Sequence, residues 1–435
     1  MTGVRHDEWI QPASVACAHR RNNLPTEVTR SERIRHARGG SAAEVFATFL
    51  KLGLISFGGP IAHLVYFHRE LITRRRWLDE EHYAQLVALC QLLPGPASSQ
   101  LGFSMGLLRA GWRGGLAAFV AFTLPSAVLL FGFAMILPVI AGPHGQAALH
   151  GLKLVAVAVV AQGVLVMARK LTPDVPRALF AVIAGAMVVV IGGAFMQLVI
   201  VALGAAFGYV FLKNSSNIAA DTFQVPYGSK TGTALLLLFA ILLLIALGYP
   251  SAHSTFGAVA AGFYRSGALV FGGGHVVLPL MQHAVVDPGW LSTEDFLAGY
   301  GAAQAVPGPL FSVSAFLGER LNGGQGGFPG AAIALVSIFL PGLLLVAGSL
   351  PLWHGLARRK GALSAISGVN AAVVGLLAAA LYDPLWTSAI HSAADFAIAL
   401  VAFVALVATR VSVLAVLAAC VLVSLVRVAV AGYHP

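Results

Sequence analysis

Residues 49–59 read FLKLGLISFGG, and residues 263–273 read FYRSGALVFGG. Each stretch begins with a phenylalanine, carries a basic residue two positions later and ends in Phe-Gly-Gly, and the second lies 214 positions after the first. In both, an apolar run too short to cross a bilayer stops at adjacent glycines. This shared pattern indicates that one unit of the chain occurs twice.

Two further blocks repeat in the same order. Trp77–Pro96 returns as Trp290–Pro309, 213 positions later, and both copies end in Gln-x-x-Pro-Gly-Pro. The pair Leu124-Pro125 returns as Leu340-Pro341, 216 positions later. Three matched blocks at nearly constant spacing indicate an internal duplication and not chance similarity.

The composition predicts a membrane protein. Of the 435 residues, 58% are hydrophobic and 10% are charged, whereas a soluble domain carries about 25% charged residues. Apolar runs of about 20 residues, the length that crosses a bilayer, recur from Gly114 to the C-terminus. We therefore predict an all-α polytopic membrane protein. A soluble protein with a large apolar core would need polar helix faces that the sequence lacks.

The positive charge is placed as in a membrane protein. The formal net charge is +10, seven arginines lie within the first 38 residues, and most other basic residues flank hydrophobic segments. Because cytosolic segments carry the excess of Lys and Arg, the N-terminus is expected in the cytosol, beside the lipid bilayer. Residues 1–40 lack the apolar core of a signal peptide. A nucleic-acid partner is not expected.

Metal, redox and enzyme chemistry have no sequence signature here. The three cysteines, Cys17, Cys90 and Cys420, are too far apart to suggest a disulfide framework or a metal site. No HExxH, Walker A or Rossmann glycine motif is present. We expect no cofactor, no metal and no catalytic residue, and coupling to an ion gradient is the simplest source of energy.

The repeats divide the chain into four parts. These are a basic tail (1–42), a first repeat (43–212), a linker with one apolar segment (213–255) and a second repeat (256–435). A single spanning segment between two copies turns the second copy over relative to the first. The predicted fold is therefore an inverted-topology repeat of two homologous halves, as in many secondary transporters.

Nine apolar segments are long enough to span. They are Gly114–Pro138, Leu152–Met167, Ala178–Phe195, Met196–Leu212, Thr233–Gly248, Gly330–Leu350, Leu363–Tyr382, Ser388–Thr409 and Val411–Val430. Four other apolar segments are interrupted, two at the Phe-Gly-Gly motifs and two at the Pro-Gly-Pro motifs. Each could be a kinked span, which gives thirteen spans in all, or a half-membrane hairpin that returns to its own side.

Loop charge favours the hairpins. If the first interrupted segment crossed the membrane, Arg69 and the run Arg74–Arg76 would lie outside, against the positive-inside rule. The corresponding loop of the second copy carries Asp287, Glu294 and Asp295 but no Lys or Arg, which suits the outside. Nine spans with four hairpins fit both loops, although the thirteen-span alternative stays open.

The interrupted segments are the candidate binding site. Backbone polar groups at membrane depth must be buried in protein or line a watery cavity, and a half-helix that starts after a break offers free N–H donors to an anion. The alternative is an ordinary kink that lets helices pack closely. The candidate residues at the breaks are Phe57, Gly58, Gly59, Pro60, Pro94, Gly95, Pro96, Ser98, Ser99, Gln100, Gly272, Gly273, Gly274, Pro307, Gly308, Pro309, Ser312 and Ser314.

The scarcity of acidic residues within the apolar runs points to an anion. Only Asp395 is expected inside a span, whereas a cation carrier holds its cargo with buried carboxylates. The candidate intramembrane cations are Lys51 and Arg265, which could instead extend to the membrane surface. His63 and His275 could donate to an anion or carry a proton, or be packed histidines. Gln91 and Gln304 suit a ligand contact or a bond between helices.

These motifs together resemble the chromate ion transporter family. The resemblance rests on Phe-Gly-Gly-Pro at Phe57–Pro60 with His63 after it, on Pro94–Pro96 followed by Gln100, and on Gly272–His275 and Pro307–Pro309 in the second copy. It implies a bacterial inner-membrane protein that exports chromate and confers resistance, with sulfate as a close analogue. Assembly into a homodimer is a further hypothesis.

The second copy departs from the family pattern at two positions, where Gly274 replaces Pro60 and Val313 replaces Gln100. This departure predicts unequal roles for the halves. Uptake of sulfate or another oxyanion, and an embedded enzyme acting on a lipid-linked substrate, remain alternatives to chromate export.

Overall fold

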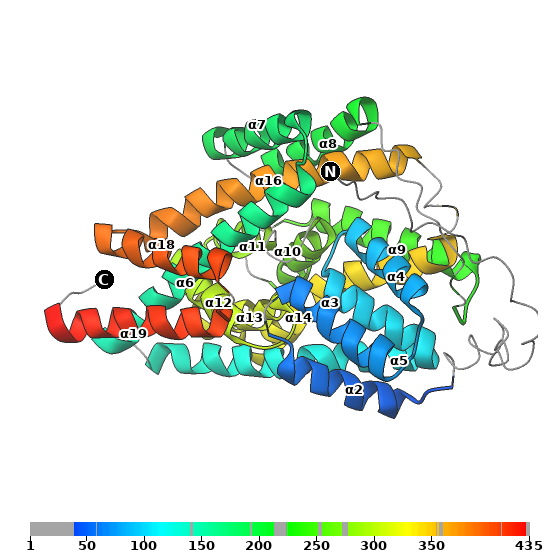
Figure 1. Cartoon of the computed structure of the whole chain (residues 1–435), viewed down its shortest axis with the longest axis horizontal. Coiled ribbons are helices and arrows are strands. Elements are labelled where there is room, and N and C mark those ends of the chain that lie inside the picture. Colours follow the sequence, from blue (N-terminus) through cyan, green and yellow to red (C-terminus); the bar gives the residue numbers. More distant parts are fainter. Residues whose placement is uncertain are drawn as a thin grey trace, which may run out of the picture.

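The computed structural model describes residues 39–57, 59–139, 142–191, 194–212, 223, 225–250, 255–271, 277–353, 355, 360–409 and 411–431. Within these ranges the chain forms helices and no strands, and the helices pack side by side in one body (Figure 1). The predicted all-α architecture of a membrane protein with two related halves is confirmed.

The first half begins with short helices and continues with long ones. The elements are α2 (Ala42–Ile55), α3 (Gly59–Phe67), the π-helix η1 (His68–Arg74), α4 (Glu80–Leu92), α5 (Ala97–Ile136), α6 (Pro143–Leu171), α7 (Val175–Ile191) and α8 (Ala194–Phe211). Helix α9 (Ser229–Gly248) then leads to the second half.

The second half repeats this order. The elements are α10 (Phe256–Ala268), α11 (Val277–Val285), α12 (Thr293–Ala305), the short 3-10 turn η4 (Leu310–Ser312), α13 (Val313–Gly324), α14 (Gly327–Ser349), α16 (Lys360–Ala380), the π-helix η6 (Leu381–Trp386), α17 (Thr387–Ala389), α18 (Ala393–Ala408) and α19 (Val413–Ala431). Helix α10 thus corresponds to α2, α12 to α4, and α14 to the long part of α5.

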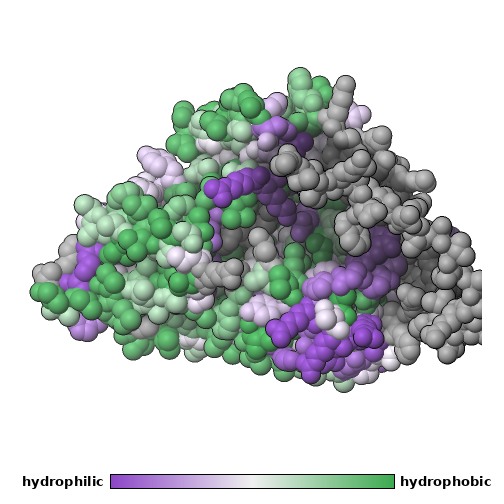
Figure 2. All heavy atoms as spheres, in the orientation of Figure 1, coloured by the Kyte–Doolittle hydropathy of each residue, from purple (hydrophilic) through white to green (hydrophobic). Residues whose placement is uncertain are grey.

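The apolar helices match the expected spans. Six helices in the described part of the chain are long and apolar enough to cross a membrane, namely those within Ala97–Val139, Pro143–Leu171, Ser229–Gly248, Gly327–Leu352, Ser364–Ala389 and Val413–Val430. Three shorter apolar helices cover Val175–Ile191, Val199–Phe211 and Ala393–Ala408. Each of the nine predicted spans therefore corresponds to a helix. Hydrophobic residues cover most of α18 and α19, whereas hydrophilic residues gather in the region of α2 and α4 (Figure 2).

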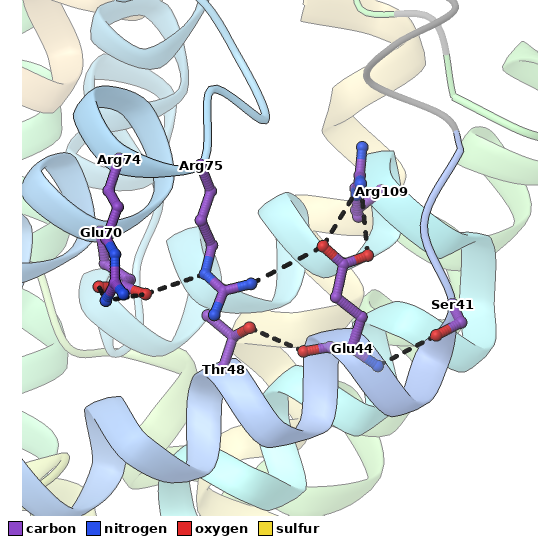
Figure 3. A network of polar contacts seen from close by, with 7 residues as sticks. All are labelled: Ser41, Glu44, Thr48, Glu70, Arg74, Arg75 and Arg109. Carbon is purple, nitrogen blue, oxygen red and sulfur yellow. Dashed lines mark hydrogen bonds and ion pairs between the residues drawn. The ribbon is translucent and has the colours of Figure 1, made fainter.

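The first interrupted segment is a hairpin. Helix α2 has 14 residues, so its two ends lie about 21 Å apart. Arg75, just after η1, nevertheless forms ion pairs with Glu70 (2.9 Å) and with Glu44 in the first turn of α2 (3.8 Å) (Figure 3). Lys51 contacts Glu70 at 3.5 Å. The chain therefore turns back at the Phe-Gly-Gly break and returns to where α2 began.

The Glu70 carboxyl holds this hairpin closed as an anion. Burial would raise its pKa, but hydrogen bonds from Arg75 and Arg74 and the charge of Lys51 lower it below the usual value. Glu44 also accepts both an ion pair from Arg75 and one from Arg109 at the end of the first part of α5 (Figure 3). The two hairpins of the first half are thus joined at their open ends.

The other interrupted segments are antiparallel hairpins as well. The side chain of Ser266 in α10 donates to the carbonyl of Leu280 in α11 at 3.0 Å. Arg320 of α13 forms an ion pair with Asp295 of α12 at 3.0 Å. In the first half, the Arg109 guanidinium lies 5.4 Å from the ring centroid of Trp77, just before α4. The structure therefore agrees with four hairpins and does not fit a straight crossing at any of the breaks.

Each Pro-Gly-Pro hairpin is followed by a second sharp turn. Within α5, Gly111 has φ +64° and separates the short first part from the long second part. A Cβ at Gly106 would lie 2.4 Å from the carbonyl oxygen of Gly114, and one at Gly318 would lie 2.3 Å from that of Gly330. These glycines let the half-helix pack backbone to backbone against the long helix.

Asp395, predicted inside a span, is fully buried at the start of α18. Its carboxylate accepts from Arg427 of α19 (2.5 Å), from Ser392 (2.8 Å) and from the imidazole of His150 on α6 (3.0 Å). Glu70 and Glu319 are buried too. Acidic residues are scarce within the apolar runs, but these three are nevertheless covered by protein.

Cysteine labelling tests the hairpin topology. We expect Gly39→Cys and Arg76→Cys, each in a chain whose native cysteines are replaced by alanine, to react with a membrane-impermeant maleimide from the same face. Both positions are open to labelling, because nothing lies near the Cβ position of Gly39 and Arg76 is exposed. Gly142→Cys, beyond the long part of α5, serves as the control and should react from the opposite face. Labelling of positions 39 and 76 from opposite faces would contradict the hairpin.

Candidate functional site

The breaks of the two halves meet in crossed pairs. The N–H of Gly95 in the first Pro-Gly-Pro donates to the carbonyl of Val270, 2.7 Å away, at the end of α10. The N–H of Gly308 in the second Pro-Gly-Pro donates to the carbonyl of Ser56, 3.0 Å away, at the end of α2. Ser56 and Val270 each precede the phenylalanine of Phe-Gly-Gly. The same bond is therefore made twice, each time between different halves.

Only glycine suits the centre of each Pro-Gly-Pro turn. Gly95 has φ +118° and Gly308 has φ +104°, backbone angles that side chains with a Cβ rarely adopt. A Cβ at Gly95 would lie 3.0 Å from the Cα of Gly342, and one at Gly308 would lie 2.9 Å from the hydroxyl of Ser126. Gly342 and Ser126 follow Pro341 and Pro125. Each turn therefore rests on the long helix of the other half, just after its proline.

Side chains fix these crossed contacts differently in the two copies. Gln100, fully buried, donates from Nε2 to the carbonyls of Pro94 (2.9 Å) and Gly342 (3.1 Å). In the other crossing, the hydroxyls of Ser126 and Ser312 are hydrogen-bonded at 2.7 Å. The second copy has Val313 at the position of Gln100 and so lacks the amide bonds. Its crossing instead uses Ser126, which takes the place that Gly342 has in the first crossing.

Several buried polar atoms at the breaks have no hydrogen-bond partner among the residues that the structure describes. They are Ser56 Oγ, His63 Nδ1, Ser99 Oγ, Gln100 Oε1 and Thr123 Oγ1. A buried donor or acceptor left without a partner costs about 1–3 kcal/mol. Unsatisfied polar atoms of this kind favour a polar ligand or water that binds at the breaks, and three of the five belong to residues that the sequence singled out.

The half-helices that leave the Pro-Gly-Pro turns begin without a side-chain cap. Pro96 precedes α5 and Pro309 precedes η4, and neither can supply a capping bond. Ser98 and Ser99 are buried in the first turn of α5. The first N–H groups of a helix carry a partial positive charge, so the start of α5 favours an anion.

The two candidate cations differ in their surroundings. Lys51 is half exposed and forms an ion pair at 3.5 Å with Glu70, which also pairs with Arg74 and Arg75. Arg265 is partly buried in α10, and within the described residues its side chain has no hydrogen bond or ion pair. Of this pair, Arg265 is therefore the cation that remains available to an anion.

Other predicted residues are placed apart from the crossed turns or cannot be placed. Gln91 is exposed and accepts from Lys170 of α6 at 3.3 Å. Ser314 donates to the carbonyl of Phe311 at 2.8 Å and so stabilises the turn after Pro309. Gly58, Gly272, Gly273, Gly274 and His275 lie outside the described residues, as does the side chain of Pro60.

Sequence reasoning missed the residues that receive the crossed turns. Ser56, Thr123, Ser126 and Gly342 were not among the candidates, although Ser126 and Gly342 directly follow the repeated Leu-Pro pairs. The signal was present in that third repeated block, which marks the place where the long helix of each half meets the turn of the other.

Alanine substitutions test the two turns. We expect Gly95→Ala and Gly308→Ala each to lower the free energy of unfolding by about 1–3 kcal/mol, because alanine is strained at these backbone angles. The measurement is thermal unfolding of purified protein in detergent. Gly132→Ala is the control, since nothing lies near its Cβ position and its helical backbone suits alanine. Turn variants as stable as the control would show that the angles are not required.

Comparison with known proteins identifies relatives over both halves. The family model for "Chromate transporter" matches residues 43–209 and 257–425. A probable chromate transport protein of Synechococcus elongatus is 30% identical over 82% of this chain and 87% of the relative. The chromate transport proteins of Pseudomonas aeruginosa and Cupriavidus metallidurans are 27% and 24% identical, over 79% and 82% of this chain and 81% and 86% of their own. No solved structure matches. The chain belongs to the chromate transporter family.

Proposed function

We propose that the protein exports chromate from the cytosol across the bacterial inner membrane, with its N-terminus in the cytosol, and thereby confers chromate resistance. The observation that carries this proposal is the crossing of the Pro-Gly-Pro turns with the Phe-Gly-Gly breaks. An uncapped helix start and buried hydroxyl groups without partners among the described residues lie at these crossings. The names of the relatives supply chromate as the substrate.

The charges around the breaks favour an anion over a cation. Within the described residues, the buried carboxylates of Glu70 and Asp395 are held by basic side chains. Glu319 lies seven residues beyond Ser312, about 10 Å along a helix. The donors at the turns without partners among the described residues are the neutral hydroxyls of Ser56, Ser99 and Thr123 and the first N–H groups of α5, and such groups can bind a tetrahedral oxyanion.

Uptake of sulfate is the alternative within the same site. Sulfate and chromate share a tetrahedral shape and a charge of −2, so donors at the turns would bind both. An enzyme acting on a lipid-linked substrate is the alternative of another class, and membership of a transporter family argues against it. The predicted homodimer stays a prediction.

Transport into vesicles tests the proposed function. Everted membrane vesicles that contain the protein should accumulate labelled chromate when energised, because export from the cell is import into an everted vesicle. Vesicles without the protein are the control. Accumulation of sulfate by right-side-out vesicles, with no chromate entering everted ones, would favour the uptake alternative. If neither oxyanion moves in either orientation, both transport proposals fail.

A matched pair of substitutions tests the assignment of the free cation. We expect Arg265→Gln to lower kcat/KM for chromate by about 10-fold or more, since a hydrogen bond to a charged group contributes about 1.5–3 kcal/mol. Lys51→Gln should change it by less than about 3-fold, because the Glu70 partner of Lys51 keeps Arg74 and Arg75 and exposed ion pairs contribute little. Equal effects of the two substitutions on kcat/KM would contradict the assignment of Arg265, and not Lys51, as the cation that binds the oxyanion.

A further inference from the structure

The imidazole of His63 has a defined tautomer. Its Nε2 lies 3.1 Å from the carbonyl oxygen of Ser56, the same oxygen that accepts the N–H of Gly308. A carbonyl oxygen can only accept, so the ring must carry its hydrogen on Nε2. The ring is therefore oriented by the crossed contact itself, and the state of its other nitrogen follows from this bond.

The other nitrogen, Nδ1, is buried and has no partner among the described residues. In the neutral ring it carries a lone pair, which accepts a hydrogen bond and repels an anion. In the protonated ring it carries an N–H, which donates to an anion. A fully deprotonated oxyanion can therefore contact Nδ1 only when His63 holds a second proton.

Among the residues that the structure describes, none is seen to supply a countercharge for a protonated His63. Each element packed around the ring contributes neutral groups: the edge of Phe122 of α5 at a centroid distance of 5.3 Å, the carbonyl of Ser56 from α2, and Gly308 from the other half. The titratable groups on the neighbouring elements have other partners. His68 pairs with Glu80, and Glu70 pairs with Lys51, Arg74 and Arg75. The hydroxyl of Tyr83 donates to the carbonyl of Leu64 at 2.7 Å.

A buried charge without a partner is strongly disfavoured. An imidazolium at this place is therefore unstable alone, and a doubly charged oxyanion held there by neutral donors is unstable without a cation. When both are bound, the imidazolium and the oxyanion serve as countercharges for each other. By linkage, a proton that strengthens oxyanion binding is itself bound more tightly when the oxyanion is present.

We propose that His63 is the proton-carrying residue of the transport cycle and binds one proton at Nδ1 together with each oxyanion. This inference rests on the proposed oxyanion transport and names its coupling ion. The proton comes from water on the side to which the site is open, and it leaves Nδ1 when the oxyanion leaves. The loaded site then carries a dianion and one proton, a net charge of −1. An interior-negative membrane potential drives that charge out of the cell without an opposing proton flow.

Proton movement in proteoliposomes tests this coupling. Full-length protein is reconstituted with a pH-sensitive dye inside, the membrane potential is clamped, and chromate is added at an alkaline pH where it is wholly the dianion. We expect about one proton to enter with each chromate in the wild-type protein, the stoichiometry of a single linked site. Chromate entry without proton entry overturns the inference. Absence of chromate entry in the wild type overturns the proposed function instead.

Substitution of His63 assigns the proton to this ring. Gln in His63→Gln keeps an N–H that can reach the carbonyl of Ser56 but has no titratable nitrogen. The dissociation constant for chromate is measured on purified protein as a function of pH. At alkaline pH it should rise by about 10-fold per pH unit in the wild type, and it should be nearly independent of pH in His63→Gln. His144→Gln, an exposed histidine on α6, is the matched control and should behave as wild type. An unchanged pH slope in His63→Gln overturns the assignment, whether or not that variant still transports.

Discussion

Backbone polar groups in the middle of a membrane protein need partners, and lipid offers none. This constraint governs the centre of the molecule. The turns that interrupt four apolar segments expose N–H and carbonyl groups, and the protein pairs Gly95 with Val270 and Gly308 with Ser56 across the two halves. Because each half completes the broken segments of the other, neither half can form a satisfied core alone. The pairing also explains why the breaks occur as two related sets.

The crossed pairs leave a surplus of donors and acceptors around them. The carbonyl of Ser56 is saturated by Gly308 and His63, and the amide nitrogen of Gln100 is saturated by two carbonyls. Other atoms, such as Ser99 Oγ and Thr123 Oγ1, are buried and have no hydrogen-bond partner in the part of the chain that the structure describes. A structure that only needed to close its breaks would have placed apolar groups at these positions. Their polarity is an argument for a ligand at the centre.

Much of this arrangement could be predicted from sequence. The repeated motifs gave the duplication, hydropathy gave the nine spans, and the charges of Arg74–Arg76 favoured hairpins over straight crossings. The partners of the breaks could not be predicted, because a local motif does not say which distant backbone satisfies it. Likewise, Lys51 and Arg265 occupy equivalent positions in the repeat, and only folding shows that Glu70 returns to Lys51. No acidic residue of the second copy corresponds to Glu70, so the equivalence of the two cations ends there.

The difference between the halves bears on how a bound oxyanion would be released. A site that held a dianion with several fixed cations would bind it tightly and release it slowly, whereas conduction requires binding that is weak enough to reverse. Here one cation of the pair, Lys51, is held in an ion pair by Glu70, and the donors at the turns are uncharged. The charge that balances the oxyanion is then mobile, a proton on His63, and can leave with it. Arg265, without a partner in the described chain, would act as a fixed attraction near the second break and not as a trap at the centre.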